Sequence, residues 1–422
     1  MDFSFSAEEQ ELLEEVRSFL KTETSEALFT ECAELGHIYG GKEGRKFIKR
    51  FASHGWLTPN WPPEYGGLGT SATLAFAIRE EMAYVGTPLV FVAAHMAGPT
   101  IMHFGSQEMK DKWLLPIARG EIEFCLGYTE PQAGSDLAAL AIRAVDKGDY
   151  FQLNGQKTFN THAHVADYHW LGTITDPDAK KYRGMSLMIV DLKSPGIDIR
   201  PMVTMAGWQT NEVFYDDVMV PKENLVGDLN AGFFYVMHAL DYERMFPLAT
   251  YGSLVDEVAE YARTTTVDGK PLAKNPMVRQ KLAQMKIELA ANRHLYYRLA
   301  HMLDSGQVPN YQASMQKLFA TEVAQRIANT GMEVLGMFSQ LTKDSKWAVL
   351  AGKSEITLKR SSEYASTIVE AREMGRPAII YGNVLNAGLI DNLPAKGCVE
   401  VAVLVDGTGL HPIRFGPLPP QL

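Results

Sequence analysis

The stretch Cys125–Leu137, CLGYTEPQAGSDL, decides how the rest of the chain is interpreted. It joins an acidic residue and a Tyr-Thr hydroxyl pair to the small residues Ala133, Gly134 and Ser135. Small residues let backbone N–H groups approach an anion closely, and Ser and Thr hydroxyls can add hydrogen bonds. Such a loop can hold a diphosphate or the polar edge of a flat ring. From these residues alone, a turn without a ligand, with Asp136 capping a helix, explains the stretch equally well.

A second stretch, LNGQKTFNTHAHVAD (Leu153–Asp167), begins with an Asn-Gly pair that predicts a β-hairpin. Phe159 stands two residues before Thr161. An aromatic side chain can lie against a flat ring, and a hydroxyl can hydrogen-bond to a ring nitrogen. The alternative is a half-buried strand with a core phenylalanine, which is favoured if this stretch is considered alone.

Composition limits the classes of protein that the chain can belong to. Its 422 residues, 46% hydrophobic and 21% charged, are typical of a globular protein with two or three domains. A net charge of −10 argues against a nucleic-acid partner. The three cysteines are scattered, which predicts reduced thiols. The histidines His162, His164 and His169 lack the ligand spacing of a metal site, so no metal is expected there. The start, MDFSFSAEEQELLEEV, lacks a signal-peptide core, and no apolar run is long enough to span a membrane, so we expect a cytoplasmic protein.

The order of patterns along the chain predicts an α+β multidomain fold. Ser6 and Glu9 form a capping-box pattern ahead of apolar residues at helical spacing. Short β-rich runs then follow, and long helical patterns return after them. The predicted parts are an N-terminal α-helical domain, a β-domain of antiparallel character, a C-terminal helical bundle and a different tail, at residues 1–122, 123–228, 229–355 and 360–422.

Four stretches, in their order and spacing, resemble the acyl-CoA dehydrogenase family over about residues 1–350. They are GSQEMKDKWLLPIARGEIEFCLGYTEPQAGSDL, FQLNGQKTFNTHAHVAD, FYDDVMVPKENLVG and GFFYVMHALDYER. The resemblance implies FAD, held between an inserted β-barrel and a helical bundle. It also implies α,β-dehydrogenation of an acyl-CoA thioester, by proton abstraction at Cα and hydride transfer from Cβ to flavin N5. An electron-accepting flavoprotein as partner and a homo- or hetero-oligomer are implied as well.

The same resemblance assigns cofactor contacts residue by residue. Ser135 is also expected to face the substrate thioester, and Phe159 stands where many members have a Trp stacked on the flavin ring. The change keeps an aromatic face for stacking. The implied flavin-binding residues are Leu126, Tyr128, Thr129, Gly134, Ser135, Phe159 and Thr161.

Glu243, in the stretch LDYERM, is the candidate catalytic base. A carboxylate in a water-poor pocket has a raised pKa and becomes a better base. By resemblance, Glu243 removes the α-proton, and Asp241 and Arg244 match substrate-contacting positions. The alternative is that Glu243 pairs with Arg244 or another arginine on a buried helix face.

Three departures from the family open a different interpretation. Thr265 stands where many members carry an arginine that reaches the flavin diphosphate of a neighbouring subunit. The stretch LGMFSQ (Leu335–Gln340) is a degenerate form of the adenine-side loop, and the last helices of the family are missing, so the predicted bundle is truncated. The chain could therefore be a non-catalytic or weakly flavinylated subunit of a heteromeric acyl-CoA dehydrogenase.

Residues 360–422 resemble the C-terminal end of NAD-dependent glycoside hydrolases of the α-galactosidase/α-glucosidase type. The stretches that carry this resemblance are RSSEYASTIVEA, YGNVLNAGLIDNLPAKGCVEV and LVDGTGLHPIRFGPLPPQL. It implies a short foreign α/β tail, and we interpret the chain as a fusion. A sugar-active protein is a remote alternative, because the dinucleotide-binding half and the metal centre of that family are not in the sequence.

Overall fold

The computed structural model describes residues 5–35, 40–88, 92–180, 182–204, 209–245, 247–267, 269–335, 377–391, 398–406 and 408–414. The chain divides into two compact units, Met1–Phe338 and Ser339–Leu422, which are described separately.

The first unit opens with helices. They are α1 (Ala7–Glu23), α2 (Glu26–Glu34), α3 (Lys42–Ala52), η1 (Pro63–Tyr65), α4 (Ala72–Val85), the π-helical segment η2 (Ala93–Ala97), α5 (Gly98–Phe104) and α6 (Gln107–Ala118). The capping box is confirmed: the Glu9 N–H donates to Ser6 Oγ, and the Ser6 N–H donates to the Glu9 carboxylate.

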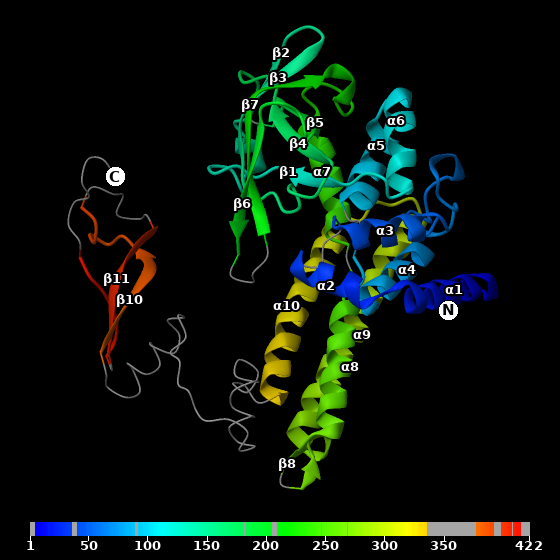
Figure 1. Ribbon diagram of the computed structural model, residues 1–422, viewed down its shortest axis with the longest axis vertical. Coiled ribbons are helices and arrows are strands. Elements are labelled where there is room, and N and C mark those ends of the chain that lie inside the picture. The colour runs from blue at the N-terminus through cyan, green and yellow to red at the C-terminus, as the bar shows by residue number, and fades with distance from the viewer. Residues whose placement is uncertain are drawn as a thin grey trace. The chain divides into compact units, whose positions relative to one another are not determined.

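A β-domain follows, as predicted. Its elements are β1 (Phe124–Gly127), η3 (Leu137–Ala139), β2 (Arg143–Asp146), β3 (Tyr150–Lys157), β4 (Tyr168–Ile174), β5 (Met185–Asp191), β6 (Ile197–Val203), β7 (Gln209–Pro221) and η4 (Lys222–Asn224). Figure 1 shows these strands gathered at one end of the unit.

The sheet is mixed, which corrects the expectation of an antiparallel barrel. β4 pairs with β5 along one edge, and β1 and then β2 pair with its other edge in parallel. Within the described residues the order β1-β4-β2-β3-β7-β6 leaves the sheet open. Parallel neighbours need a long crossover connection. Here the whole β2–β3 hairpin lies in the segment between β1 and β4, so adjacent sequence patterns could not show the pairing.

The hairpin predicted at Asn154–Gly155 is wrong. Both residues lie inside β3, where its register against β7 shifts, and Gly155 has φ 146°. The pair therefore marks a β-bulge, for which a glycine is also suited. The turn that joins β2 to β3 contains Gly148, at φ 91°.

Helices return after the sheet, in the predicted order. They are α7 (Gly232–Glu243), α8 (Ala249–Thr264), α9 (Pro276–Asp304) and α10 (Tyr311–Val334), with the short β8 (Thr266–Val267), β9 (Lys270–Pro271) and η5 (Leu272–Lys274). The helices α8, α9 and α10 run side by side (Figure 1). The predicted truncation of the bundle falls outside the described residues.

The second unit contains three described strands. β10 (Ala378–Leu385), β11 (Cys398–Asp406) and β12 (Gly409–Pro412) form an antiparallel sheet in the order β10-β11-β12. The helical part of the predicted α/β tail falls outside the described residues. The glycoside-hydrolase resemblance of the tail stays a prediction, and so do the four domain bounds.

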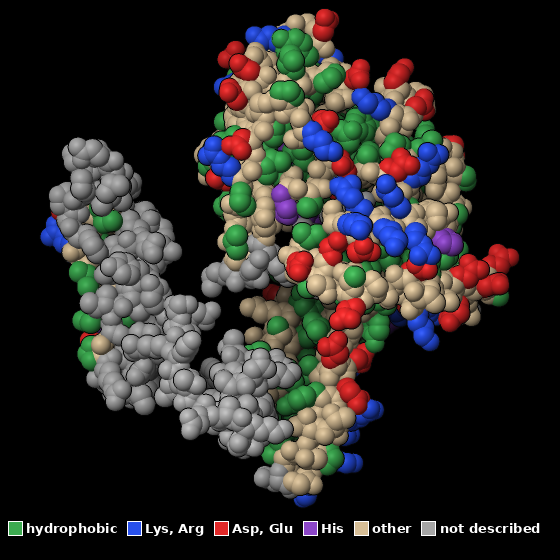
Figure 2. All heavy atoms as spheres, in the orientation of Figure 1, with side chains coloured by type: hydrophobic (Ala, Val, Ile, Leu, Met, Phe, Trp, Pro, Cys, Tyr) green, Lys and Arg blue, Asp and Glu red, His purple; other side chains and the backbone are tan. Residues whose placement is uncertain are grey.

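Buried apolar clusters hold the first unit together. The largest joins the N-terminal helices to one side of the sheet and to α7, with Trp113, Trp170 and Ala239 among its members. On the face shown in Figure 2, acidic and basic side chains are interspersed over the described residues. Exposed ion pairs such as Lys222–Asp146 contribute only ~0–1 kcal/mol each, so the buried clusters dominate stability.

In the part of the chain that the structure describes, no helix combines the length and apolar character needed to cross a membrane.

Candidate active site

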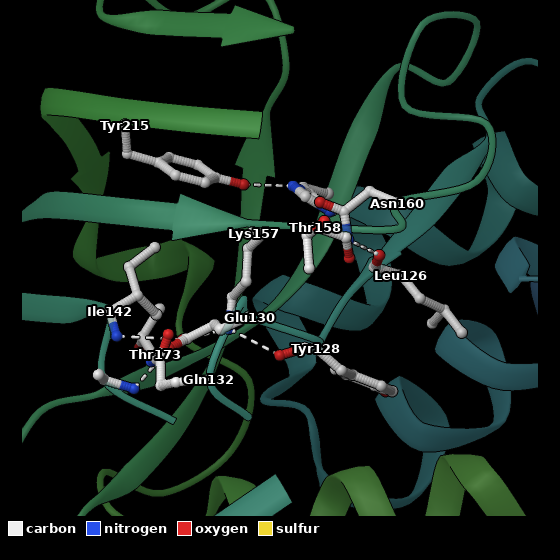
Figure 3. Close-up of polar contacts among 12 residues, drawn as sticks. Leu126, Tyr128, Glu130, Gln132, Ile142, Lys157, Thr158, Asn160, Thr173 and Tyr215 are labelled. Carbon is white, nitrogen blue, oxygen red and sulfur yellow. Dashed lines mark hydrogen bonds and ion pairs between the residues drawn. The ribbon is translucent and has the colours of Figure 1, made fainter. Parts of the chain in front are cut away.

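The loop that follows β1 is folded around the carboxylate of Glu130. This side chain is 3% exposed. It accepts hydrogen bonds from the backbone N–H groups of Ala141, at 2.7 Å, and Ile142, at 3.1 Å, and from the Gln132 amide, at 2.6 Å (Figure 3). A backbone bridge from Glu130 to Ala133 closes the turn. Gly134 and Ser135 follow that turn and are exposed.

Lys157, at the end of β3, ties this loop to the next one. Its ammonium group is fully buried and donates to Glu130, at 2.8 Å, and to the Tyr128 carbonyl, at 3.0 Å (Figure 3). Burial lowers the pKa of Lys157 to about 8. A buried ion pair fixes geometry only when its remaining atoms are also hydrogen-bonded, as they are for Glu130.

Two buried asparagines hold the segment Phe159–Thr161 against β1. The Asn160 amide donates to the Leu126 carbonyl at 2.9 Å, and the Asn211 amide donates to the Asn160 carbonyl at 2.8 Å. The Thr161 hydroxyl lies 3.3 Å from that of Thr210. The backbone N–H of Thr158 also donates to the Thr129 carbonyl, at 2.9 Å.

These contacts bring together the two segments that the sequence assigned to the cofactor. Leu126 and Thr129 are half-buried and Tyr128 is buried, whereas Gly134, Ser135 and Thr161 are exposed beside them in the chain. Phe159 is 61% exposed and has φ 55°, in the left-handed region. The alternative of a core phenylalanine at this position is therefore wrong.

The exposed residues fit a flat ring with a polar arm. A phenylalanine held outward at a positive φ costs free energy that its own packing does not return, which is typical of a functional position. A Cβ added at Gly134 would meet nothing within 4 Å, so a ligand has room to approach that backbone.

The predicted cap role of Asp136 is not seen, because its side chain makes no capping hydrogen bond to η3.

Glu243 lies at the end of α7, half-buried. Burial raises the pKa of its carboxyl, and the charges of Lys317 and Arg244 offset part of that rise. Among the described residues, the Glu243 carboxylate makes neither a hydrogen bond nor an ion pair. Arg244 instead pairs with Asp241 at 2.9 Å, and Asn310 donates to the same Asp241 oxygen at 2.9 Å. The alternative in which Glu243 pairs with Arg244 is thus not the arrangement in the structure.

Tyr128 connects Glu243 to the loop after β1. Burial raises the pKa of the Tyr128 hydroxyl, and the charge of Glu243 raises it further, so the two groups lie within electrostatic range. The Trp170 indole N–H lies beside the Tyr128 hydroxyl and offsets part of this rise. A carboxylate with a raised pKa therefore lies near the buried tyrosine of the predicted flavin loop.

Sequence reasoning missed Glu130, Lys157, Asn160 and Asn211. For Lys157 the available signal was a charge at an inward position of an alternating strand, where only a paired lysine is stable. Asn211 lies outside both singled-out stretches.

The comparisons with known proteins agree with this geometry. The models of the acyl-CoA dehydrogenase N-terminal, middle and C-terminal domains match residues 6–121, 125–218 and 230–356. Acyl-CoA dehydrogenase FadE26 of Mycobacterium tuberculosis is 37% identical over 372 residues, covering 84% of this chain and 91% of the relative. The caffeyl-CoA reductase-Etf complex subunit CarC of Acetobacterium woodii is 30% identical over 347 residues, covering 80% and 90%. The crystal structure of the ChsE4-ChsE5 complex from Mycobacterium tuberculosis matches at 35% identity with a TM-score of 0.74, covering 84% and 91%.

The chain therefore belongs to the acyl-CoA dehydrogenase family, whose members are flavin-using oxidoreductases that act on CH–CH donors. The resemblance predicted from the sequence and the succession of helical, β and helical parts are confirmed.

Proposed function

We propose that this chain is an FAD-dependent acyl-CoA dehydrogenase in which Glu243 removes the α-proton of the thioester. The observation that carries the proposal is the state of Glu243: half-buried, without a partner among the described residues, and with its pKa raised by burial beside Tyr128. A base of this kind holds the abstracted proton more strongly than an exposed glutamate does.

The residues proposed to hold FAD are those of the two linked loops. Phe159 offers an aromatic face, Thr161 a hydroxyl beside it, and Gly134 and Ser135 an exposed turn with free backbone approach. Leu126, in β1, and Tyr128 and Thr129, just after that strand, are the remaining residues proposed to contact the flavin. When bound, the flavin accepts the hydride that leaves Cβ of the substrate.

The proposed substrate contacts lie at the C-terminus of α7. Arg244 is fixed by Asp241, which Asn310 holds in turn, so its guanidinium is oriented before a ligand arrives. Ser135, in the exposed turn, is the proposed contact to the thioester end. Because Glu243 is on the same helix end as Arg244, binding of the CoA thioester there would bring its α-carbon within reach of the base.

The experiment that tests this proposal is the replacement Glu243→Gln. The amide keeps the shape and removes the base, so we expect turnover to fall by about 10²–10⁴-fold with flavin still bound. Dye-coupled turnover and the flavin spectrum of the same sample measure both properties. Glu223→Gln, at an exposed carboxylate paired with Lys112, is the matched control and should keep full turnover. Undiminished turnover in Glu243→Gln would refute the assignment.

A second candidate is a partner subunit with little flavin of its own. Thr265 caps α8 where many relatives have an arginine, and one matched crystal structure is of a two-protein complex, ChsE4-ChsE5. An electron-accepting flavoprotein is the other proposed partner, because CarC belongs to a reductase-Etf complex. Native mass spectrometry after purification separates the cases. Flavin in a homo-oligomer excludes the second candidate, and a flavin-poor chain recovered with a stoichiometric partner supports it.

A further inference from the structure

Asn211, in β7, is a buried asparagine that binds the segment carrying Phe159. The residue is 0% exposed. Its amide nitrogen lies 2.8 Å from the Asn160 carbonyl oxygen and 3.0 Å from Nδ1 of His164. The Asn160 N–H donates in turn to the backbone carbonyl of Asn211, at 2.9 Å. One residue of the sheet thus holds Asn160 through both its side chain and its backbone.

The Asn160 carbonyl fixes the direction of the Asn211 amide. A carbonyl oxygen can only accept hydrogen bonds, so the NH₂ group of Asn211 must face it. The Asn211 side-chain oxygen accepts from the Gln209 amide, at 2.7 Å. The second N–H of Asn211 is left for His164, whose Nδ1 needs a lone pair to accept it. Burial lowers the pKa of His164, which favours the neutral imidazole that this contact requires.

The segment that Asn211 holds is strained at two residues. Phe159 has φ 55° and His162 has φ 74°, both in the left-handed region that residues other than glycine rarely adopt. Such a conformation persists only where the surrounding structure fixes it. Asn160, between the two, is 1% exposed, and its amide donates to the Leu126 carbonyl at 2.9 Å (Figure 3). Asn160 is therefore fixed from two sides, by β1 and by Asn211.

The flavin candidates Phe159 and Thr161 are the two chain neighbours of Asn160. Because the Phe159 ring is 61% exposed, packing of the ring itself does little to keep it in place. Its position therefore depends on the backbone of Asn160, which Asn211 holds. Thr161 is joined to the same strand, since its hydroxyl lies 3.3 Å from that of Thr210.

We infer that Asn211 is a positioning residue for the flavin site. Through the backbone of Asn160, it holds the Phe159 ring where the ring can stack on FAD, and His164 orients its amide for this role. The inference rests on the proposed function, because it needs FAD to bind at Phe159. It predicts that Asn211 affects FAD binding only while the aromatic ring is present.

A double-mutant cycle on the full-length chain tests whether Asn211 acts through Phe159. Asn211→Leu removes the side-chain hydrogen bonds and keeps a similar volume. It is made with and without Phe159→Ala, and fluorescence titration gives the FAD affinity of each protein. We expect Asn211→Leu alone to weaken FAD binding by about 3- to 5-fold, no more than Phe159→Ala itself does. In the Phe159→Ala background it should weaken binding by less than about 2-fold, because no ring remains to be positioned.

Two changes at His164 separate positioning from packing. His164→Asn places an amide oxygen where Nδ1 lies, so it can accept the same hydrogen bond and should keep the FAD affinity of wild type. His164→Leu fills similar space without an acceptor and should weaken FAD binding by about 3-fold. Rescue by the asparagine alone is a result that a packing role does not produce.

The matched control is Asn224→Leu. Asn224 is also buried, and its amide donates to the Ile189 carbonyl at 2.9 Å, which joins η4 to β5. Loss of this hydrogen bond should lower Tm and leave FAD affinity unchanged, because η4 and β5 carry none of the residues proposed to contact the flavin.

Each outcome decides the question. If Asn211→Leu weakens FAD binding equally with and without the Phe159 ring, or if Asn224→Leu weakens it as much, the inference is overturned and the proposed function stands. If the wild-type chain binds no FAD, the proposed function fails and takes the inference with it. If Asn211→Leu does not fold, the His164 variants decide: rescue by asparagine but not by leucine supports positioning, and equal affinities contradict it.

Discussion

At the residue scale, Glu243 predicts the pH profile of the reaction. Only the deprotonated carboxylate can accept the α-proton, and burial raises its pKa above that of a free glutamate. The value of kcat/KM should therefore fall as the pH falls through this raised pKa, with the acidic limb above the usual glutamate range. Stopped-flow measurement of flavin reduction across pH gives the limb. An acidic limb at or below the free-glutamate pKa would contradict the assignment.

Phe159 carries a separate prediction. Because its ring is 61% exposed, Phe159→Ala should change the free energy of unfolding of the flavin-free chain by less than about 0.5 kcal/mol. Loss of a stacking face should weaken flavin binding by roughly 1 kcal/mol, while Phe159→Trp keeps the affinity. Fluorescence titration with FAD measures the affinity. Equal affinity in all three proteins would remove Phe159 from the flavin site.

Glu123 makes stability depend on pH. Its carboxyl is 2% exposed, and burial raises its pKa to about 8. The folded state therefore keeps a proton that the unfolded state releases near the ordinary glutamate pKa. The contribution of Glu123 to the free energy of unfolding is complete below the ordinary glutamate pKa and is lost as the pH rises toward 8. The slope from this group is about 1.4 kcal/mol per pH unit at most. Thermal unfolding from pH 5 to 8 should show a smaller decline in Glu123→Gln than in wild type, and identical declines would contradict this account.

Residue types alone pointed to part of the candidate site. Gly134, Ser135 and Thr161 stand out because they are small or carry hydroxyls, and the structure leaves them exposed. Glu130 and Asn211 could not be found in this way. Their roles depend on burial against backbone groups that are distant in the sequence, and a single sequence does not reveal such contacts.

At the scale of elements, the buried ion pair between Lys157 and Glu130 is one of several contacts that join the loop after β1 to the end of β3. Lys157→Met would leave the Glu130 carboxylate buried without its cation, which should cost about 3–5 kcal/mol. Lys222→Met, which breaks the exposed pair with Asp146, should cost less than about 1 kcal/mol. Urea unfolding of both variants gives the comparison. Similar costs for the two would show that the buried pair does not hold the loops together.

Helices were easier to predict than strand neighbours. The capping box at Ser6 and Glu9 is local, because a helix start depends on residues three apart. The parallel contact of β1 with β4 depends on a crossover that spans residues 128–167, and no local pattern encodes it. The Asn-Gly pair at 154–155 was misassigned because a bulge and a hairpin turn favour the same residues.

At the scale of the whole molecule, the family and its helical, β and helical succession were predictable because several long stretches match together. The acyl group could not be predicted in this way. An acyl-chain pocket is formed by side chains of several helices, and one sequence does not place these side chains relative to one another.

The visible absorbance spectrum of the purified chain, before and after anaerobic addition of a mixed set of acyl-CoAs, is the first measurement to make on the proposed function. We expect an oxidised flavin spectrum that bleaches on addition of thioester, because in the proposed function the two loops hold FAD and Glu243 removes the α-proton. A colourless protein, or a flavin spectrum that no acyl-CoA changes, would contradict it.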